Sequence, residues 1–412
     1  MIRLRGCSTP RLCGALLLTL APWALVATSP ALDWDLSLDA RLVTSDAQPP
    51  FAQDGSGTVR FGEDDSGLRL GRARLALTQP FGEVWSAHID LSMYDDYDRS
   101  PVGVTEAYLL FRPYPRSGYR LRVKAGGFYA PISLENRAAG WDSPYTISYS
   151  AIDSWLGIEV RTLGLEAQLD WLGTRLGHSF DLGVTGGVFG WNQGAGTVLA
   201  GGGWSLTDRQ TALFGRIGTP GVPPTYGALP FEQYDHRAGV YGGIEARYLD
   251  RLTVRALRYD NRADPAASDS VSGEMAWWTR FNSAGARYEG DGGWTAIVQW
   301  MSGETTIAPP GLSLSWPFKA EYALLAKRFG RHTLSARYDR FMVSTNIAEG
   351  DGSQDGHAWT AAYAYDAGAH WRIALEWLQV VSSSYNRVEL GGLPLATETQ
   401  LQLSIRYAIG SH

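Results

Sequence analysis

The sequence predicts an all-β protein, a transmembrane antiparallel β-barrel. Three observations support this prediction. Segments of roughly ten residues alternate apolar with polar side chains, which is the period of a strand with one face in lipid and one in water. The connectors between these segments alternate between short and long, as they do in outer-membrane barrels. After residue 26, no stretch is long and apolar enough for a membrane-spanning helix.

The alternation is clearest in the segments 85–93, 162–171, 372–377 and 400–407. In each segment one face is an apolar stripe that carries an aromatic residue at one end, and these residues are Trp85, Trp171, Trp377 and Tyr407. Aromatic residues at the ends of apolar strands are typical of a girdle at the membrane interface. A soluble β-sandwich also alternates, so the connectors must separate the two possibilities.

The short connectors contain turn residues and the long connectors lie between them. The short ones are 80–83, 115–118, 207–210, 249–251, 290–293, 329–332 and 366–369. The long ones are 45–67, 95–102, 130–156, 217–236, 262–273, 303–316, 345–356 and 384–397. We predict 16–18 strands, with short periplasmic turns and long extracellular loops. Eighteen is favoured, and sixteen remains open because the region 196–217 is rich in glycine and poorly periodic.

The N-terminus predicts export. Residues 1–31 form a signal peptide with a basic start, an apolar run over 12–26 and small residues at 27–31, where we expect cleavage. A retained membrane anchor is the alternative, but the run is short for one. Residues 32–412 then form a single barrel domain, and the bacterial outer membrane is its expected location. Both cysteines, Cys7 and Cys13, fall in the signal, so the mature chain has no disulfide or thiolate metal site.

The sequence contains no recognisable catalytic motif. Asp235 and His236 are adjacent at the end of an expected strand, where neighbouring side chains point to opposite faces and do not form a hydrogen-bonded dyad. We therefore predict no enzyme, no cofactor and no metal. The formal net charge of -6 argues against nucleic-acid binding. An enzyme built on a barrel and an exported soluble β-rich binding protein remain weaker alternatives.

The segment 125–135, Ala-Gly-Gly-Phe-Tyr-Ala-Pro-Ile-Ser-Leu-Glu, resembles the start of the third loop in the phosphate-selective porin O/P family. The resemblance implies an outer-membrane diffusion channel, usually a homotrimer, whose third loop folds into the lumen and narrows it. The chain departs from the family in its lysines, which are Lys124, Lys319 and Lys327 alone. A lysine cluster at the constriction therefore has no counterpart here, and phosphate selectivity does not carry over.

Eight residues are candidates for the wall of the pore or its constriction. Arg120, Arg122 and Lys124 alternate along one segment and so share a strand face, where they would attract anions or pair with carboxylates on neighbouring strands. The candidates in the 130–156 loop are Glu135, Arg137, Asp142, Tyr145 and Asp153. If that loop lies outside the barrel, these five are ordinary solvated groups.

We therefore expect a porin that allows passive diffusion of small polar or anionic solutes, with phosphate among the candidates and a weak preference for anions. A porin selective for one small organic solute, held by the 130–156 loop, is the alternative. The expected partners are outer-membrane lipid and two further copies of the chain.

Overall fold

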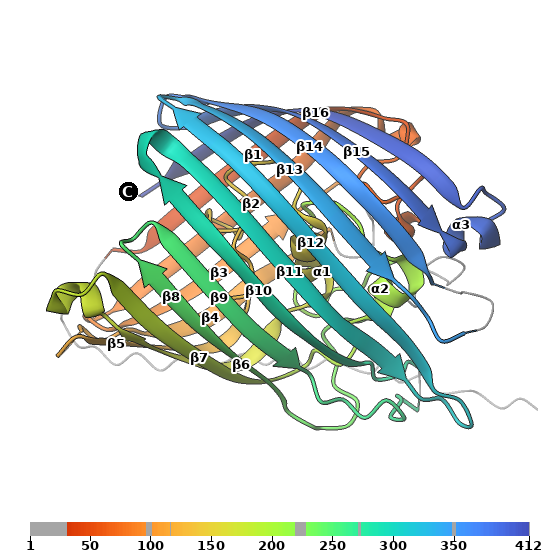
Figure 1. The fold of residues 1–412 in the computed structure, drawn as a ribbon, viewed down its shortest axis with the longest axis horizontal. Coiled ribbons are helices and arrows are strands. Elements are labelled where there is room, and N and C mark those ends of the chain that lie inside the picture. Colours follow the sequence, from red (N-terminus) through yellow and green to blue (C-terminus); the bar gives the residue numbers. More distant parts are fainter. Residues whose placement is uncertain are drawn as a thin grey trace, which may run out of the picture.

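The computed structural model describes residues 31–95, 101–115, 117–218, 228–270, 273–347 and 352–411. They form a closed barrel of sixteen strands in which each strand pairs antiparallel with the next and β1 pairs with β16 (Figure 1). Closure leaves no open sheet edge, so strand hydrogen bonds are satisfied without water, as a bilayer requires.

The strands are β1 (Asp33–Ser45), β2 (Gly67–Phe81), β3 (Trp85–Met93), β4 (Val102–Phe111), β5 (Tyr119–Phe128), β6 (Thr162–Trp171), β7 (Phe180–Gly190), β8 (Gly239–Tyr248), β9 (Leu252–Asp260), β10 (Trp278–Gly290), β11 (Trp294–Ile307), β12 (Leu314–Phe329), β13 (His332–Val343), β14 (Gln354–Ala367), β15 (Trp371–Ser384) and β16 (Leu395–Gly410). The α-helices are α1 (Ala151–Glu159), α2 (Thr197–Gly202) and α3 (Tyr385–Glu389). Four 3-10 helices are η1 (Phe51–Gln53), η2 (Glu63–Asp65), η3 (Gly173–Leu176) and η4 (Asp291–Gly293).

The favoured count of eighteen strands is wrong. The two extra strands were expected around a turn at 207–210, but the chain from β7 to β8 is one long connection, which we call L4 (191–238). Glycines at 194, 196, 201, 202 and 203 weaken strand formation there, and Gly196 and Gly203 adopt positive φ values of 109° and 76°. Sixteen is also an even number of strands, so the start of β1 and the end of β16 still lie at the end of the barrel that carries the short turns.

The outer wall is apolar along the strands. Leu165, Val184, Ile244 and Leu375 are examples of large apolar side chains that are exposed on it. Aromatic side chains gather where strands meet the short turns: Phe81, Trp85, Phe111, Tyr119, Trp171, Phe180, Tyr248, Trp294, Phe329 and Trp371. An apolar band with such a girdle matches a bilayer and its interface.

Among the described residues, no helix is long and apolar enough to cross a membrane. The predicted signal peptide, 1–31, lies outside the described residues except for its last position, and it stays a prediction.

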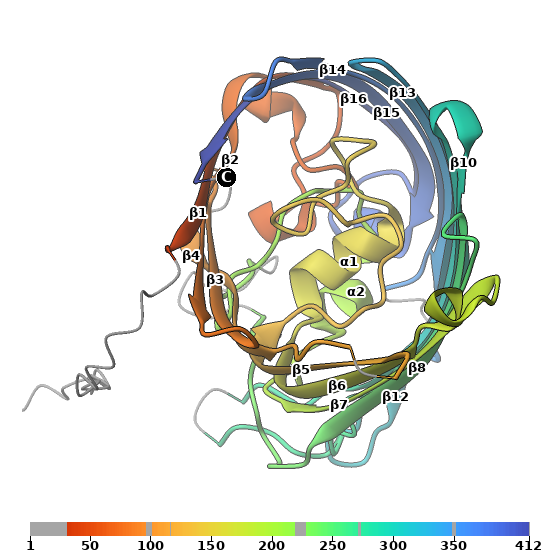
Figure 2. The ribbon, with the colours of Figure 1, turned by 90° about the vertical axis from the view of Figure 1, so that its left-hand side faces the viewer.

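The inside of the barrel has two different halves. On β10–β15 apolar inward side chains form one core with helix α1 and the residues around it, and Phe281, Phe318 and Leu378 are examples. Polar groups such as Arg337 and Glu376 lie among them. On β2–β9 the inward side chains are mostly polar or charged. Figure 2 shows α1 and α2 inside the ring of strands, which places loop structure in the lumen.

We expect the outer wall to reject charge. Val184 lies between Leu169 and Ile244 on the apolar exterior, and an Arg at the middle of such a band costs about 2–4 kcal/mol. Val184→Arg should lower the free energy of unfolding in lipid vesicles by that amount. The neighbouring Thr185 faces the lumen, so Thr185→Arg should change it by less than about 1 kcal/mol. Equal effects of the two substitutions would contradict the assigned strand faces.

Candidate pore constriction

The connection between β5 and β6, which we call L3 (129–161), crosses the interior of the barrel. Its first part lies against β9 and β11. Arg255 Nη1 donates to the carbonyl oxygens of Pro131 at 2.9 Å and Ser133 at 3.1 Å. The Gln299 amide donates to the Ile132 carbonyl at 3.0 Å and accepts from another backbone N–H of the same segment. These bonds satisfy buried backbone groups that water would otherwise have to reach.

Arg337 of β13 holds the middle of L3. Its guanidinium is fully buried and donates to Glu135 Oε1 at 2.7 Å, to Asp339 Oδ2 at 2.8 Å, and to the carbonyl oxygens of Ser148 and Tyr149, both at 2.8 Å. Isolated burial of such a charge would be very costly, so the carboxylates and carbonyls of the loop are needed to stabilise it. Two charges on β13 thereby fix L3 to the wall.

The tip of L3 reaches the opposite wall. Asp142 Oδ2 accepts from Arg72 of β2 at 2.6 Å and from Arg406 of β16 at 2.8 Å, and its other oxygen accepts from the Tyr149 hydroxyl at 2.5 Å. Since L3 contacts β9, β13, β2 and β16, it spans the lumen rather than lying along one side.

Helix α1 gives L3 its apolar anchor. The Ser150 hydroxyl accepts from the Asp153 backbone N–H at the start of the helix, which is the usual role of an N-cap residue. One turn on, the Trp155 ring packs at 5.3 Å from Phe281 and 5.1 Å from Phe318. These contacts fill the β10–β12 side of the lumen with side chains.

L4 is a second inward loop, which was not predicted from the sequence. Asp208, expected in a periplasmic turn, lies buried inside the barrel and pairs with Arg41 of β1 at 2.5 Å and with Arg60 at 2.9 Å. Burial alone would raise the pKa of Asp208, but the two guanidinium groups hold that pKa well below its ordinary value. Arg60 belongs to the first long loop, L1 (46–66), so one carboxylate joins L4 to both L1 and the wall.

Glu159 at the end of α1 joins L3 to L4. Its carboxylate accepts from the backbone N–H groups of Gly196, Val198 and Leu199, at 2.8–3.1 Å, and from the Trp155 indole at 2.7 Å. Burial raises the pKa of the Glu159 carboxyl to about 7, even though all four bonds favour its ionised form. This single side chain supplies the acceptors for the first turn of α2.

Between L3 and the strands lies a polar cavity of about 600 Å³. Among the described residues that line it, seven carry a cationic side chain and three a carboxylate, so its lining has more cationic than anionic groups. The cations are Arg74, Arg122, Lys124, Arg137, Arg247, Arg255 and Arg287, and the carboxylates are Asp90, Glu106 and Glu245.

The carboxylates of this wall are shared between cations. Glu245 accepts from Arg247 at 2.6 Å and from Arg255 at 2.8 Å. Asp170 pairs with both Arg120, at 2.8 Å, and Arg122, at 3.5 Å. In each of these two groups one carboxylate faces two guanidinium groups, so cations outnumber carboxylates locally.

The structure brings three of the eight predicted site residues to this cavity: Arg122, Lys124 and Arg137. Lys124 lies 3.8 Å from Glu166 on the neighbouring strand, so this member of the cationic segment is paired with a carboxylate and is still partly exposed. Arg120 pairs with Asp170 and does not line the cavity among the residues described.

The remaining four predicted residues hold L3 in place. Glu135, Asp142 and Asp153 are buried, and Tyr145 packs against the apolar core. Burial, together with the neighbouring Glu135, raises the pKa of Asp153 well above its ordinary value. These three carboxylates, which the sequence predicted at the constriction, are therefore covered by protein and are not among the described residues that line the cavity.

The other four cations of the lining, Arg74, Arg247, Arg255 and Arg287, were not among the predicted site residues. The signal was present in strand parity, since Arg255 and Arg287 share the inward face with Thr253 and Ser283 on their strands. Among the described residues, no group of three or more His, Cys, Asp and Glu side chains is placed to hold a metal ion.

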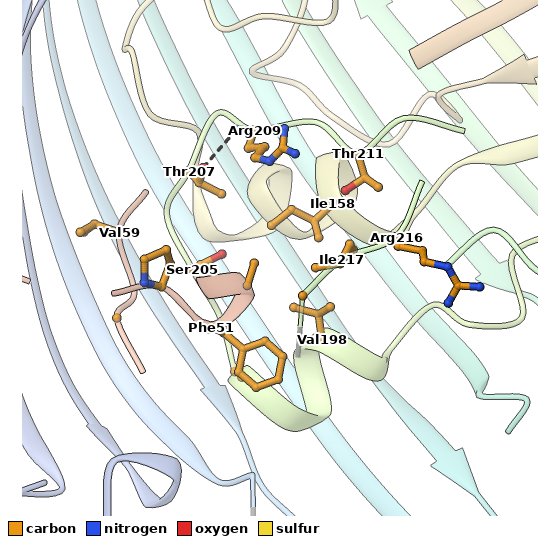
Figure 3. Close-up of a pocket in the computed structure, with 16 residues that line it drawn as sticks. Phe51, Val59, Ile158, Val198, Ser205, Thr207, Arg209, Thr211, Arg216 and Ile217 are labelled. Carbon is orange, nitrogen blue, oxygen red and sulfur yellow. Dashed lines mark hydrogen bonds between the residues drawn. The ribbon is translucent and has the colours of Figure 1, made fainter. Parts of the chain in front are cut away.

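A second, much smaller cavity of about 50 Å³ lies where L1, α1 and L4 meet (Figure 3). Phe51, Ile158, Val198 and Ile217 surround it, and Figure 3 shows these side chains gathered at the junction. A volume of this size holds only a few water molecules. We treat it as imperfect packing between loops, not as a solute site.

No family model and no curated protein matches the chain. Similar solved structures are the trimer form of OmpT, an outer membrane protein of Vibrio cholerae (TM-score 0.53, 11% identity, covering 92% of this chain and 99% of that one), and the outer membrane channel DcaP of Acinetobacter baumannii (0.53, 11%, 92% and 96%). An anion-selective porin from Comamonas acidovorans has a TM-score of 0.50 at 12% identity, covering 92% and 99%.

These likenesses show the fold, which is that of the sixteen-stranded outer-membrane porins. Together with the apolar outer wall and its aromatic girdle, the fold places the chain in the bacterial outer membrane. The resemblance to the phosphate-selective family in particular stays a prediction.

Arg337→Met should release L3. Removing one partner of a buried ion pair costs about 3–5 kcal/mol and leaves Glu135 and Asp339 unpaired. We expect faster proteolysis within L3 and a larger, noisier single-channel conductance. Arg340→Met on the same strand replaces an exposed outward arginine and should change neither readout. Unchanged proteolysis in Arg337→Met would show that L3 does not depend on this residue.

The docking of L4 on α1 should weaken as pH rises. Because the pKa of Glu159 is raised from 4.5 to about 7 in the docked state, protonation favours docking. This contribution is complete below about pH 4.5 and is lost as pH rises through about 7, with an upper limit of about 3 kcal/mol. Proteolysis within L4 should therefore increase between about pH 5 and pH 8. Glu159→Gln does not titrate and should show a flatter pH dependence, and identical slopes in the two proteins would refute the role of Glu159.

Proposed function

We propose that the protein is a porin, a passive diffusion channel for small polar and anionic solutes, with a constriction formed by L3 and L4. The observation that carries the proposal is the cavity beside L3, whose lining holds seven cations against three carboxylates. A channel performs no chemistry, so the charge and width of its narrow part set its selectivity.

The route for solutes follows the β2–β9 side of the lumen. On the other side, α1 packs against apolar inward residues of β10–β15 and fills much of the lumen there. On the first side, Arg122, Lys124 and Arg137 keep roughly a third to a half of their side chains exposed, at 34%, 28% and 48%. Partly exposed, incompletely neutralised cations next to water are suited to transient anion contacts.

The lining favours anions in general and not phosphate in particular. Six of its seven cations are arginines and one is Lys124. The planar guanidinium matches carboxylate as well as phosphate oxygens. Phosphate is therefore one candidate solute among several.

The enzyme alternative finds little support in the site. Asp235 accepts hydrogen bonds from Gln193 and from the backbone N–H groups of Arg237 and Asp264, so its carboxylate organises the L4 and L5 backbones. L5 denotes the connection 261–277. We accordingly propose a channel and no catalytic activity.

We propose a homotrimer as the functional assembly. The similar OmpT of Vibrio cholerae is described in a trimer form. The outer wall of β1 exposes Leu36, Leu38 and Leu42, and this apolar surface can face either lipid or another copy of the chain.

Planar-bilayer recording tests the channel and its charge preference. We expect stepwise conductance and a reversal potential in a KCl gradient that indicates chloride over potassium. The double variant Arg122→Gln/Lys124→Gln removes two of the seven lining cations and should reduce the permeability ratio by about two- to fivefold, an order-of-magnitude expectation for lining charges. Arg251→Gln, at a short turn where Arg251 pairs with Asp291, should leave the ratio unchanged. Absence of conductance would refute the proposed function, and cation preference would refute its anionic part.

A further inference from the structure

The tip of L3 presents a tryptophan at the polar cavity. Residues 138–142 form a tight hairpin in which the backbone N–H groups of Arg137 and Ala138 both donate to the Asp142 carbonyl at 3.0 Å. Trp141 precedes Asp142 and lines the cavity. Asp142 itself is fixed by Arg72 and Arg406 on the far wall, so the hairpin and its indole are held on both sides.

The backbone of Trp141 is strained. Its φ is +54°, and the preceding Gly140 has a φ of +70°. A bulky residue in the left-handed region costs about 1–2 kcal/mol and persists only where surrounding contacts impose it. Position 140 requires glycine, because an added Cβ would lie 2.4 Å from Arg74 Nε. The chain therefore bears a cost to place an aromatic ring at this point of the lumen.

The ring of Trp141 stands on a stable support. It stacks on Tyr129 with ring centroids 4.0 Å apart and planes 4° from parallel. Arg161 lies 3.8 Å above the Tyr129 ring and, since Trp141 occupies one face, uses the other. Tyr149 also contacts Trp141, with the two rings nearly perpendicular at 87° and their centroids 5.7 Å apart. Tyr129, Tyr149 and Arg161 are buried, while Trp141 is only half-buried.

Aromatic surface and positive charge thus share one cavity. Trp141 contributes a partly exposed indole to the lining, and Arg122, Lys124 and Arg137 in the same lining contribute partly exposed cations. A cavity of about 600 Å³ has room for a small planar organic molecule together with water. Inorganic anions can use the cations but gain nothing from the indole.

We propose that this cavity is a binding subsite for small aromatic carboxylates, with Trp141 as its specificity-determining residue. The solute's ring packs on the indole, and its carboxylate contacts the cations of the lining. Binding is weak, because a channel must also release its solute. The inference rests on the proposed function, since the solute reaches Trp141 only through an open lumen.

Competition with chloride current tests the proposal. Benzoate and cyclohexanecarboxylate have the same charge and nearly the same size, but only benzoate has an aromatic ring. Added to the wild-type channel in planar bilayers, benzoate should reduce chloride current at concentrations about three- to tenfold lower than cyclohexanecarboxylate, as expected for one aromatic pair. Trp141→Leu should bring the two inhibition constants together and leave chloride conductance measurable.

Trp191→Leu is the matched control. Trp191 also has a positive φ, of 50°, but it lies in L4, is 46% exposed and does not line the cavity among the residues described. The Trp191→Leu channel should retain the preference for benzoate over cyclohexanecarboxylate. Equal inhibition by the two acids in the wild-type channel would overturn this inference. If that channel still conducts and still prefers anions, the proposed function is unaffected. A silent channel would overturn both, and this wild-type comparison does not depend on how any variant folds.

Discussion

Buried guanidinium groups on the inner wall determine where the long loops lie. The exterior of the barrel must be apolar, so the charged side chains of its strands face inward, and those shielded from water need partners there. Arg337 takes Glu135 from L3, and Arg41 takes Asp208 from L4. In both cases the strand supplies the cation and one local carboxylate, Asp339 or Asp39, and the loop supplies a second. If such a loop left the lumen, the buried guanidinium would lose one of its two carboxylates and would have too few hydrogen-bond acceptors.

The same constraint divides the lumen. Once L3 is fixed to β13, helix α1 lies against β10–β12 and fills that side with Trp155 and its neighbours. The polar cavity lies on the β2–β9 side, where carboxylates such as Glu245 and Asp170 are each shared by two cations. The excess of cations in the lining of this cavity therefore comes from arginines on neighbouring strands, and it does not need a separate cluster of lysines.

Much of the fold could be predicted from the sequence, because lipid imposes the period of each strand. Alternation around Leu165 and Leu403 identified strands correctly, and turn residues such as those at 249–251 marked the short connections. L4 could not be predicted in this way. Its segment around Asp208 has turn-like residues, but they are buried against Arg41 and Arg60, a contact over more than a hundred residues of sequence. Local patterns carry no information about such pairings.

The site shows the same division between local and long-range information. The inward direction of Arg122 and Lys124 followed from strand parity, and the structure places both at the cavity. For L3, charge alone could not separate residues that face solute from residues that hold the loop, and Glu135, Asp142 and Asp153 belong to the second group. The distinction has a physical basis. Because L3 is tied to β13 through Arg337 and to β2 and β16 through Asp142, the hairpin between these ties cannot relax. Such a rigid support can keep Trp141 in a left-handed conformation, whereas a loop anchored at one end only would release the strain by moving.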